Sequence, residues 1–194
     1  MRSCRRNSVV LMALGMLALA VVATADQGTS EKPFAPGGRV RLDLSAGAYS
    51  IRAGRDDRIL VQWETGASEG HQVKVDLRID ATTATVRTSG PRNNFRVIIE
   101  VPSRVDLHVD LTAGDLRIDQ IVGNKDIGSW AGDIVVDVGS ADDYGRVDAS
   151  VKAGEISAAP FHVRKGGLFR SFSWKGPGPY TLKVALTAGN LTLR

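Results

Sequence analysis

A nine-residue phrase built around an Ala-Gly pair occurs five times in this chain and limits what the chain can fold into. The copies are LSAGAYSIR, LTAGDLRID, SWAGDIVVD, VKAGEISAA and LTAGNLTLR. Two positions before the alanine stand Leu44, Leu111, Ser129, Val151 and Leu186, and four positions before it stand Leu42, Val109, Ile127, Ala149 and Val184. This mostly apolar alternation with a period of two is typical of a strand with one buried face. The alternation resumes after the glycine, so each copy predicts a strand, a corner and a second strand.

Glycine supplies the corner because it adopts positive φ angles without steric cost. Gly114, Gly132 and Gly154 are 18 and 22 residues apart, close to the length of one turn of a β-solenoid. We expect an all-β, single-domain fold: a β-solenoid or β-helix-like stack of strand–corner–strand repeats. A β-sandwich whose strands share their turn chemistry is the alternative. Between the first two copies, the runs RILVQWE, QVKVDLRI, ATVRTS and NFRVIIEVP predict an N-terminal antiparallel meander.

The first 25 residues have the layout of a secretory signal peptide. Arg2, Arg5 and Arg6 precede an apolar run from Val9 to Val22, which ends in Ala23-Thr24-Ala25. The run is shorter than the roughly 20 residues that span a bilayer, so we expect cleavage and no membrane span afterwards. Residues 26–37 are polar and rich in Pro and Gly and predict a flexible leader, and residues 38–194 form the β-repeat domain.

Removal of the signal peptide changes the charge balance and the cysteine content of the chain. The whole chain carries 25 basic and 21 acidic residues, but three arginines lie in the signal, which leaves 22 basic against 21 acidic residues. This near-neutral balance gives no basis for a nucleic-acid partner. The single cysteine, Cys4, also lies in the signal, which excludes a disulfide framework, thiol catalysis and cysteine-ligated metal in the processed chain.

Two constellations could carry chemistry. Asp115, Asp133, Glu155 and Asn190 follow the glycine in four copies, and their oxygens resemble calcium ligands, but corner residues of these types commonly bond their own backbone. Asp142, Asp143, Arg146, Asp148 and Lys152 are the candidates for an enzyme acting on acidic polysaccharide, although nothing in ADDYGRVD fixes an acid/base pair. We therefore expect no enzyme, no metal and no cofactor.

Aromatic residues provide the binding candidates. The alternation places Trp130 on the outward face, as a platform for a sugar ring or an anchor for a protein, unless the register slips by one residue in the SWAG copy. The segment LFRSFSWKGPGPY, residues 168–180, either caps the apolar end of the stack or forms a binding patch. From it we take Phe169, Arg170 and Trp174, together with Trp130, as the candidate binding residues.

Three separated phrases resemble the bacterial putative-adhesin, or toastrack-like, family. They are AGAYSIRAGRDDRILVQWE, VPSRVDLHVDLTAGDLRIDQIVGNKDIGSWAGDIVVD and KGPGPYTLKVALTAGNLTLR, and the resemblance extends from Gly38 to Arg194. It implies a stack of β-strands and an envelope or surface location, and it brings no catalytic residues with it. Ala48 and Trp130 depart from the usual phrase.

Together these features predict an exported, non-enzymatic adhesion or interaction module of the bacterial cell envelope, in the periplasm or at the cell surface. Its partner is an envelope or surface protein or a glycan. The alternatives are a polysaccharide-active β-helix enzyme and an envelope scaffold or sensor that binds another protein.

Overall fold

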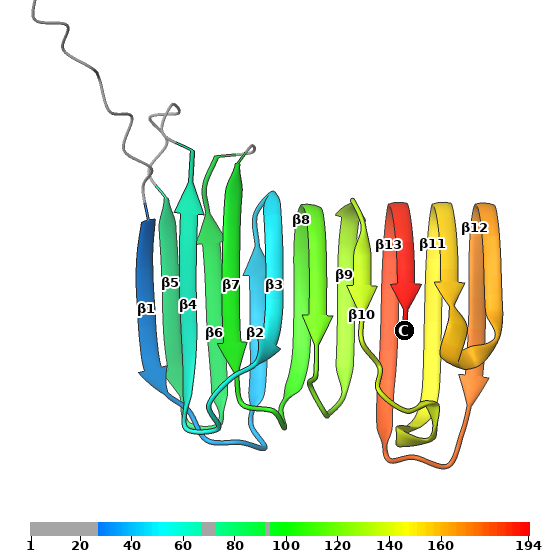
Figure 1. The fold of residues 1–194 in the computed structure, drawn as a ribbon, viewed down its shortest axis with the longest axis horizontal. Helices are drawn as coiled ribbons and strands as arrows, with labels where there is room; N and C mark the ends of the chain where they lie inside the picture. The colour runs from blue at the N-terminus through cyan, green and yellow to red at the C-terminus, as the bar shows by residue number, and fades with distance from the viewer. Residues whose placement is uncertain (1–26, 67–72, 92–93) are drawn as a thin grey trace, which may run out of the picture.

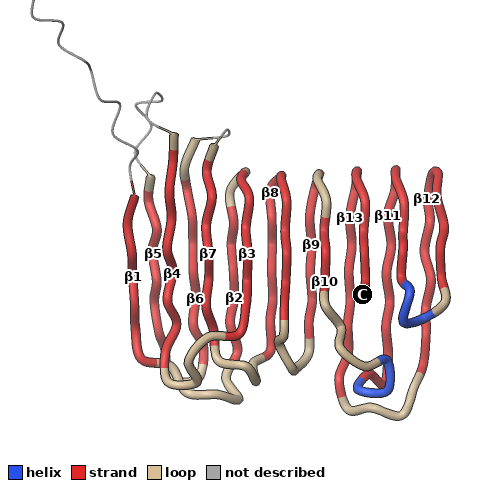
Figure 2. The backbone as a smooth tube through the Cα atoms, in the orientation of Figure 1, coloured by secondary structure: helices blue, strands red, loops and turns tan. Residues whose placement is uncertain are grey.

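The computed structural model describes residues 27–66, 73–91 and 94–194. The expected signal peptide, residues 1–25, lies outside the described residues. Figures 1 and 2 show that strands make up most of the fold. Within the described residues there is no α-helix, only the short 3₁₀ segments η1 (Ala141–Asp143) and η2 (Ala159–Phe161). The all-β prediction is confirmed.

In the described part of the chain, the sheet contains thirteen strands. They are β1 (Gln27–Pro33), β2 (Arg39–Leu44), β3 (Gly47–Ala53), β4 (Arg58–Thr65), β5 (Lys74–Asp80), β6 (Thr83–Ser89), β7 (Phe95–Val101), β8 (Asp106–Asp119), β9 (Lys125–Ala131), β10 (Ile134–Val136), β11 (Tyr144–Ala158), β12 (Val163–Lys175) and β13 (Tyr180–Leu193).

The strands form two layers that enclose one core. Layer A runs in the order β5, β6, β2, first half of β8, β9, first half of β13, first half of β11 and second half of β12. Layer B runs in the order β1, β4, β7, β3, second half of β8, β10, second half of β13, second half of β11 and first half of β12. The long strands β8, β11, β12 and β13 therefore bend from one layer into the other (Figure 1).

The five copies of the phrase stack in parallel, each as a strand, a corner and a strand. Their spatial order differs from their order along the chain. The last copy, β13, lies between β9/β10 on one side and β11 on the other (Figure 1). The chain thus does not wind as one continuous coil, because its C-terminal strand is inserted into the middle of the stack.

Glycines at the corners form a column through the stack. Gly114, Gly132, Gly189 and Gly154 have φ angles of +112°, +123°, +128° and +140°. Along the stack the corner glycines follow the order Gly47, Gly114, Gly132, Gly189, Gly154. A Cβ on any of the last four would lie far inside van der Waals contact with the main-chain oxygen of the glycine before it. Both the dihedral angle and the close approach require glycine, which explains why the phrase retains it.

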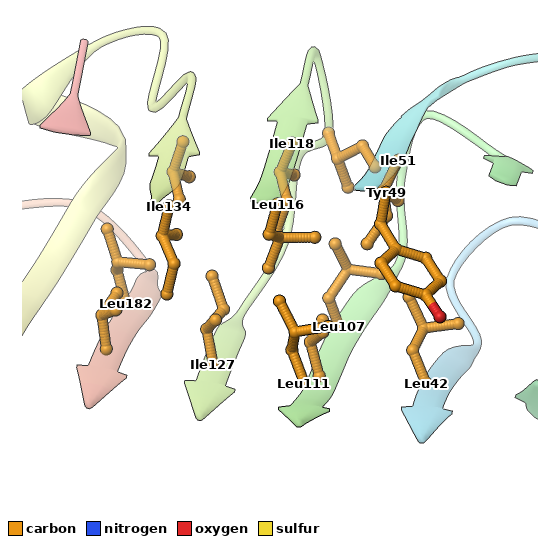
Figure 3. Packing of buried hydrophobic residues seen from close by; sticks show 14 of the residues in the cluster. Leu42, Tyr49, Ile51, Leu107, Leu111, Leu116, Ile118, Ile127, Ile134 and Leu182 are labelled. Atoms are coloured by element: carbon orange, nitrogen blue, oxygen red, sulfur yellow. The ribbon is translucent and has the colours of Figure 1, made fainter. Parts of the chain in front are cut away.

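The core lies between the layers and is made by the alternating columns read from the sequence. Figure 3 shows Leu42, Leu107, Leu111, Ile127 and Leu182 of layer A facing Tyr49, Ile51, Leu116, Ile118 and Ile134 of layer B. All of these side chains are buried. Full burial of such a side chain contributes about 1.5–3 kcal/mol to folding, so these two columns are the main source of stability.

The region before the second copy departs from the expected meander. Its antiparallel pairs, β4 with β7 and β5 with β6, lie in different layers, and β7 and β6 then pair in parallel with β3 and β2. Only β5 and β6, which are consecutive in the chain, form a hairpin, whereas β4 and β7 are joined through that hairpin in the other layer.

The flexible leader predicted over residues 26–37 is wrong for most of its length. Gln27–Pro33 forms β1, which pairs along its whole length with β4 and so supplies backbone partners to the end of layer B. Arg58 donates to Glu31 at 2.8 Å, and Phe34, directly after the strand, is buried in the core. The folded unit therefore begins at β1 and not at Gly38.

The corner column predicts a large effect of one methyl group. We expect Gly132→Ala to lower the free energy of unfolding by about 3 kcal/mol or more, because the new Cβ meets the carbonyl of Gly114 at a positive φ. Gly166→Ala is the control, since a Cβ there has open space. Urea unfolding of both variants tests this, and a loss below about 1 kcal/mol for Gly132→Ala would contradict the account of the corner.

Candidate functional site

Trp130 lies on the outer face of layer A. The register places it level with Thr112 of β8 and Thr187 of β13, and the residue is 68% exposed. No register slip turns the indole inward. Gly128 is the preceding outward residue on the same strand, so the indole stands beside hydroxyl groups and a residue without a side chain. Trp130 is an isolated aromatic platform on a polar face.

The aromatic segment of β12 divides between the core and the surface. Phe172 is 8% exposed, and Phe161 packs against Phe172 and Trp174 with ring centroids 6.0 Å and 5.0 Å apart. These three rings close the core at the last strand of the stack. Trp174 is half-buried and packs against the core, whereas the other two candidates from this segment, Phe169 and Arg170, are exposed.

Leu168 and Phe169 belong to the part of this segment that lies at the surface. Residues 163–168 of β12 pair with the second half of β11 and residues 170–175 with its first half, so Phe169 stands at the bend between the layers. Leu168 is 65% exposed and Phe169 is 80% exposed. Phe169 has a φ of +53°, which is unfavourable for a bulky side chain. The bend thus holds an aromatic ring in solvent at a conformational cost.

Two cations are fixed at the same bend. Arg170 donates from Nε to the carbonyl of Gly166 at 2.8 Å, and Lys165 donates from Nζ to the carbonyl of Ser171 at 2.8 Å. Each bond joins the two halves of β12 across the bend, one with its donor after the bend and the other with its donor before it. Lys165, Gly166, Phe169, Arg170 and Ser171 line a recess, which we call the end recess. Sequence reasoning found Phe169 and Arg170 but missed Lys165, for which the only signal was its position before Gly166-Gly167.

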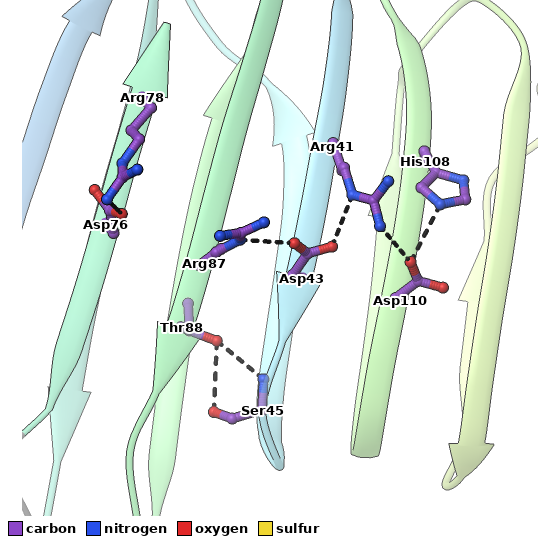
Figure 4. Close-up of polar contacts among 9 residues, drawn as sticks. All are labelled: Arg41, Asp43, Ser45, Asp76, Arg78, Arg87, Thr88, His108 and Asp110. Carbon is purple, nitrogen blue, oxygen red and sulfur yellow. Dashed lines mark hydrogen bonds and ion pairs between the residues drawn. The ribbon is translucent and has the colours of Figure 1, made fainter.

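The outer face of layer A also carries a chain of exposed ion pairs (Figure 4). Asp43 accepts from Arg87 at 2.9 Å and from Arg41 at 3.0 Å, and Asp110 lies 3.5 Å from Arg41 and 3.1 Å from His108. Partial burial raises the pKa of Asp43, but the hydrogen bonds from the two arginines outweigh it and bring the pKa below its ordinary value. This carboxylate therefore stays ionised, which suits a structural partner better than a general acid.

The residues considered for polysaccharide chemistry are not brought together as an acid/base pair. Asp142 and Asp143 lie in η1, whereas Lys152 lies near the corner of β11. Asp148 pairs with Arg146 at 2.5 Å and accepts from Ser173 at 2.6 Å, and these hydrogen bonds lower its pKa. Of these candidates, only Arg146 and Asp148 form an ion pair that the structure records.

The acidic positions after the corner glycines bond to protein groups. Asp133 accepts from the backbone N–H and the side-chain amide of Asn190, at 3.1 Å and 3.0 Å. Glu155 pairs with Arg164 at 2.7 Å. Three of the four positions considered as calcium ligands, Asp133, Glu155 and Asn190, are thus used to hold neighbouring strands together.

Lys125 occupies an inward position of layer A, level with Leu107 and Leu182, and is only 2% exposed. Its amine donates to the Tyr144 hydroxyl at 2.8 Å and to the Gly123 carbonyl at 3.3 Å. Burial lowers the pKa of Lys125 to about 8, against the opposing effect of the carboxylates of Asp137, Asp143 and Asp106. The amine is enclosed by the protein and is not placed to meet a surface ligand.

This buried amine predicts a stability that depends on pH. The ordinary lysine pKa is about 10.4, so the unfolded chain binds more protons than the folded one between pH 8 and 10.4, and stability rises with pH in that window. Burial also raises the pKa of Tyr144, which opposes the rise above about pH 10. We expect the free energy of unfolding to increase by about 2 kcal/mol from pH 7 to pH 10.

Chemical unfolding at several pH values measures this rise. Lys125→Met is expected to abolish most of it, because the column then holds an apolar side chain. Lys183→Met, which changes an exposed lysine on the neighbouring strand, is the matched control and is expected to keep it. An unchanged pH profile in Lys125→Met would refute the assignment.

Comparison with known proteins adds information on the fold. No family model and no curated protein matches the sequence. A putative cell adhesion protein from Clostridium sporogenes is 13% identical, with a TM-score of 0.57 over 87% of this chain and 99% of that one. This chain shares the fold of that protein. A putative adhesin from Parabacteroides merdae is 12% identical and covers 87% of this chain and 78% of its own, but its TM-score is 0.35.

The first of these neighbours agrees with the resemblance noted from the repeat phrases, since its name is that of a cell adhesion protein. At this identity the likeness extends to the fold and not to a ligand. Within residues 27–66, 73–91 and 94–194 no helix is long and apolar enough to cross a membrane.

Proposed function

We propose that this protein is an exported, non-enzymatic adhesion or interaction module of the bacterial cell envelope. It acts in the periplasm or at the cell surface and binds an envelope protein or a glycan. The single observation that carries the proposal is the bend of β12, where Leu168 and Phe169 stand in solvent beside Arg170 and Lys165.

An exposed aromatic side chain next to a guanidinium is typical of a contact surface, because Trp, Tyr and Arg dominate the binding energy of protein interfaces and apolar groups are seldom left in solvent together. Phe169 also retains an unfavourable φ, which stability alone would not favour at an exposed position. The shared fold with a cell adhesion protein and the signal-like segment 1–25 support the same role and an exported location.

The enzymatic alternative has less support. The carboxylates of Asp43 and Asp148 each accept hydrogen bonds from arginine, which lowers their pKa values, whereas a general acid needs a raised pKa. General acid–base catalysis would also require a second catalytic group at a defined distance from the carboxylate. The recorded partner of Asp148 is instead Arg146, in an ion pair.

A capture experiment tests the proposal. Purified protein is crosslinked to solubilised envelope material, and bound proteins and glycans are identified and quantified for the wild type, a Phe169→Ser/Arg170→Gln double variant and Trp130→Ala. We expect the double variant to lose at least about 90% of the captured partner, as loss of two interface anchors implies. Trp130→Ala reports whether the face of layer A contributes.

Val122→Ser is the control, because Val122 is an exposed apolar residue away from β12. A partner that is a protein with no sugar would favour the scaffold or sensor form of the proposal. Equal capture by the wild type, both variants and an unrelated β-protein would refute an interaction role for these surfaces, and release of shortened glycans would favour the enzyme.

A further inference from the structure

The end recess is positively charged and has no acidic residue on its own strand. β12 contains Arg164, Lys165, Arg170 and Lys175 and no Asp or Glu. Glu155 on the neighbouring strand is neutralised by Arg164 at 2.7 Å. Lys165 and Arg170 therefore leave a net positive charge at the recess, and the complementary ligand group is an anion.

The cations are held in place before any ligand arrives. The bond from Arg170 Nε to the Gly166 carbonyl fixes the plane of the guanidinium, and within the described residues its two terminal nitrogens have no hydrogen-bond partner. The Lys165 amine uses one of its donors on the Ser171 carbonyl. A planar guanidinium with free terminal nitrogens suits the two oxygens of a carboxylate, and prior ordering reduces the entropy lost on binding.

Phe169 adds an apolar surface to the same recess. Phe169 is 80% exposed, and its backbone is held at a φ of +53° between the two halves of the strand. Aromatic rings in solvent contact the apolar face of a ring-shaped ligand. The recess thus combines one aromatic face with two fixed cations, which is the chemistry of a sugar ring that bears a carboxylate.

An added peptide strand fits β12 less well. Peptides that join a sheet edge bind through free main-chain groups. Here the carbonyls of Gly166 and Ser171 already accept from Arg170 and Lys165, and charged side chains along an edge strand oppose pairing with another chain. We therefore assign the ligand to the side chains at the bend and not to the strand edge.

We propose that the end recess binds a carboxylated glycan, with Phe169 against a sugar ring and Arg170 and Lys165 on its carboxylate. This inference rests on the proposed interaction function and names its ligand class. Figure 1 places β12 at one end of the stack, opposite β1, so the end recess lies at the bend of an end strand, where its two halves join the two layers.

The test uses three hexamers of matched length: hexagalacturonate, its carboxyl-reduced neutral counterpart and hexaglutamate. Titration calorimetry at low salt is expected to show binding of hexagalacturonate by the wild type, weakened at least about tenfold in Arg170→Gln and in Phe169→Gly. Arg78→Gln, an exposed arginine of β5 at the other end of the stack that pairs with Asp76, is the matched control and is expected to leave binding unchanged.

Phe169→Gly separates binding from folding. Glycine accepts the positive φ, so thermal unfolding of this variant is expected at or above the wild-type temperature while hexagalacturonate binding is lost. A structural role of the ring would instead lower the unfolding temperature.

Three results would overturn the inference. The first is equal binding of the neutral hexamer, the second is binding unaffected by Arg170→Gln, and the third is a preference for hexaglutamate, which would assign the recess to an acidic peptide. Failure of all three hexamers to bind, with partner capture still dependent on Phe169 and Arg170, would remove the glycan inference and leave the interaction function standing.

Discussion

Close main-chain contact at the corners is the constraint on which the rest of the structure depends. Each of the four corner glycines at positive φ lies against the carbonyl of the glycine before it in the stack, so no side chain fits between successive copies. This contact fixes the register of β8, β11 and β13 and of the β9–β10 copy at one point, and a shift by one residue would turn each apolar column outward. The layered core, the outward Trp130 and the bend of β12 all follow from that alignment.

The core is closed differently at the two ends of the stack. At one end β1 and β5 close layers B and A, with Phe34 buried after β1. At the other end a single strand, β12, serves both layers, and Phe161, Phe172 and Trp174 fill the gap between them. The bend of that strand lies outside the core, with Leu168 and Phe169 exposed. Its side chains are therefore free to be selected for contacts outside the protein.

Local patterns predicted the columns and the corners because both depend only on neighbours in sequence. Leu111 and Leu186 are buried as their alternation indicates, and Trp130 faces outward. The position of β13 between β9 and β11 could not be predicted from the sequence, because five similar copies are compatible with several orders of parallel pairing. Phe169 and Trp174 were assigned together, but the bend separates them. Lys125 replaces an apolar residue in a column, and its amine is satisfied there by the Tyr144 hydroxyl, 19 residues away in the sequence, and by the Gly123 carbonyl.

The insertion of β13 affects how the fold can be completed. Its residues, 180–193, come after every other described strand in the sequence, and they form the seam between β9/β10 and the β11–β12 pair. Until they are present, the stack consists of two separate parts with exposed edges. Long-range pairing of this kind is slow compared with local contacts. The two parts of the core are therefore joined only when β13 pairs with β9 and β10 on one side and with β11 on the other, so that closure of the whole stack depends on one strand.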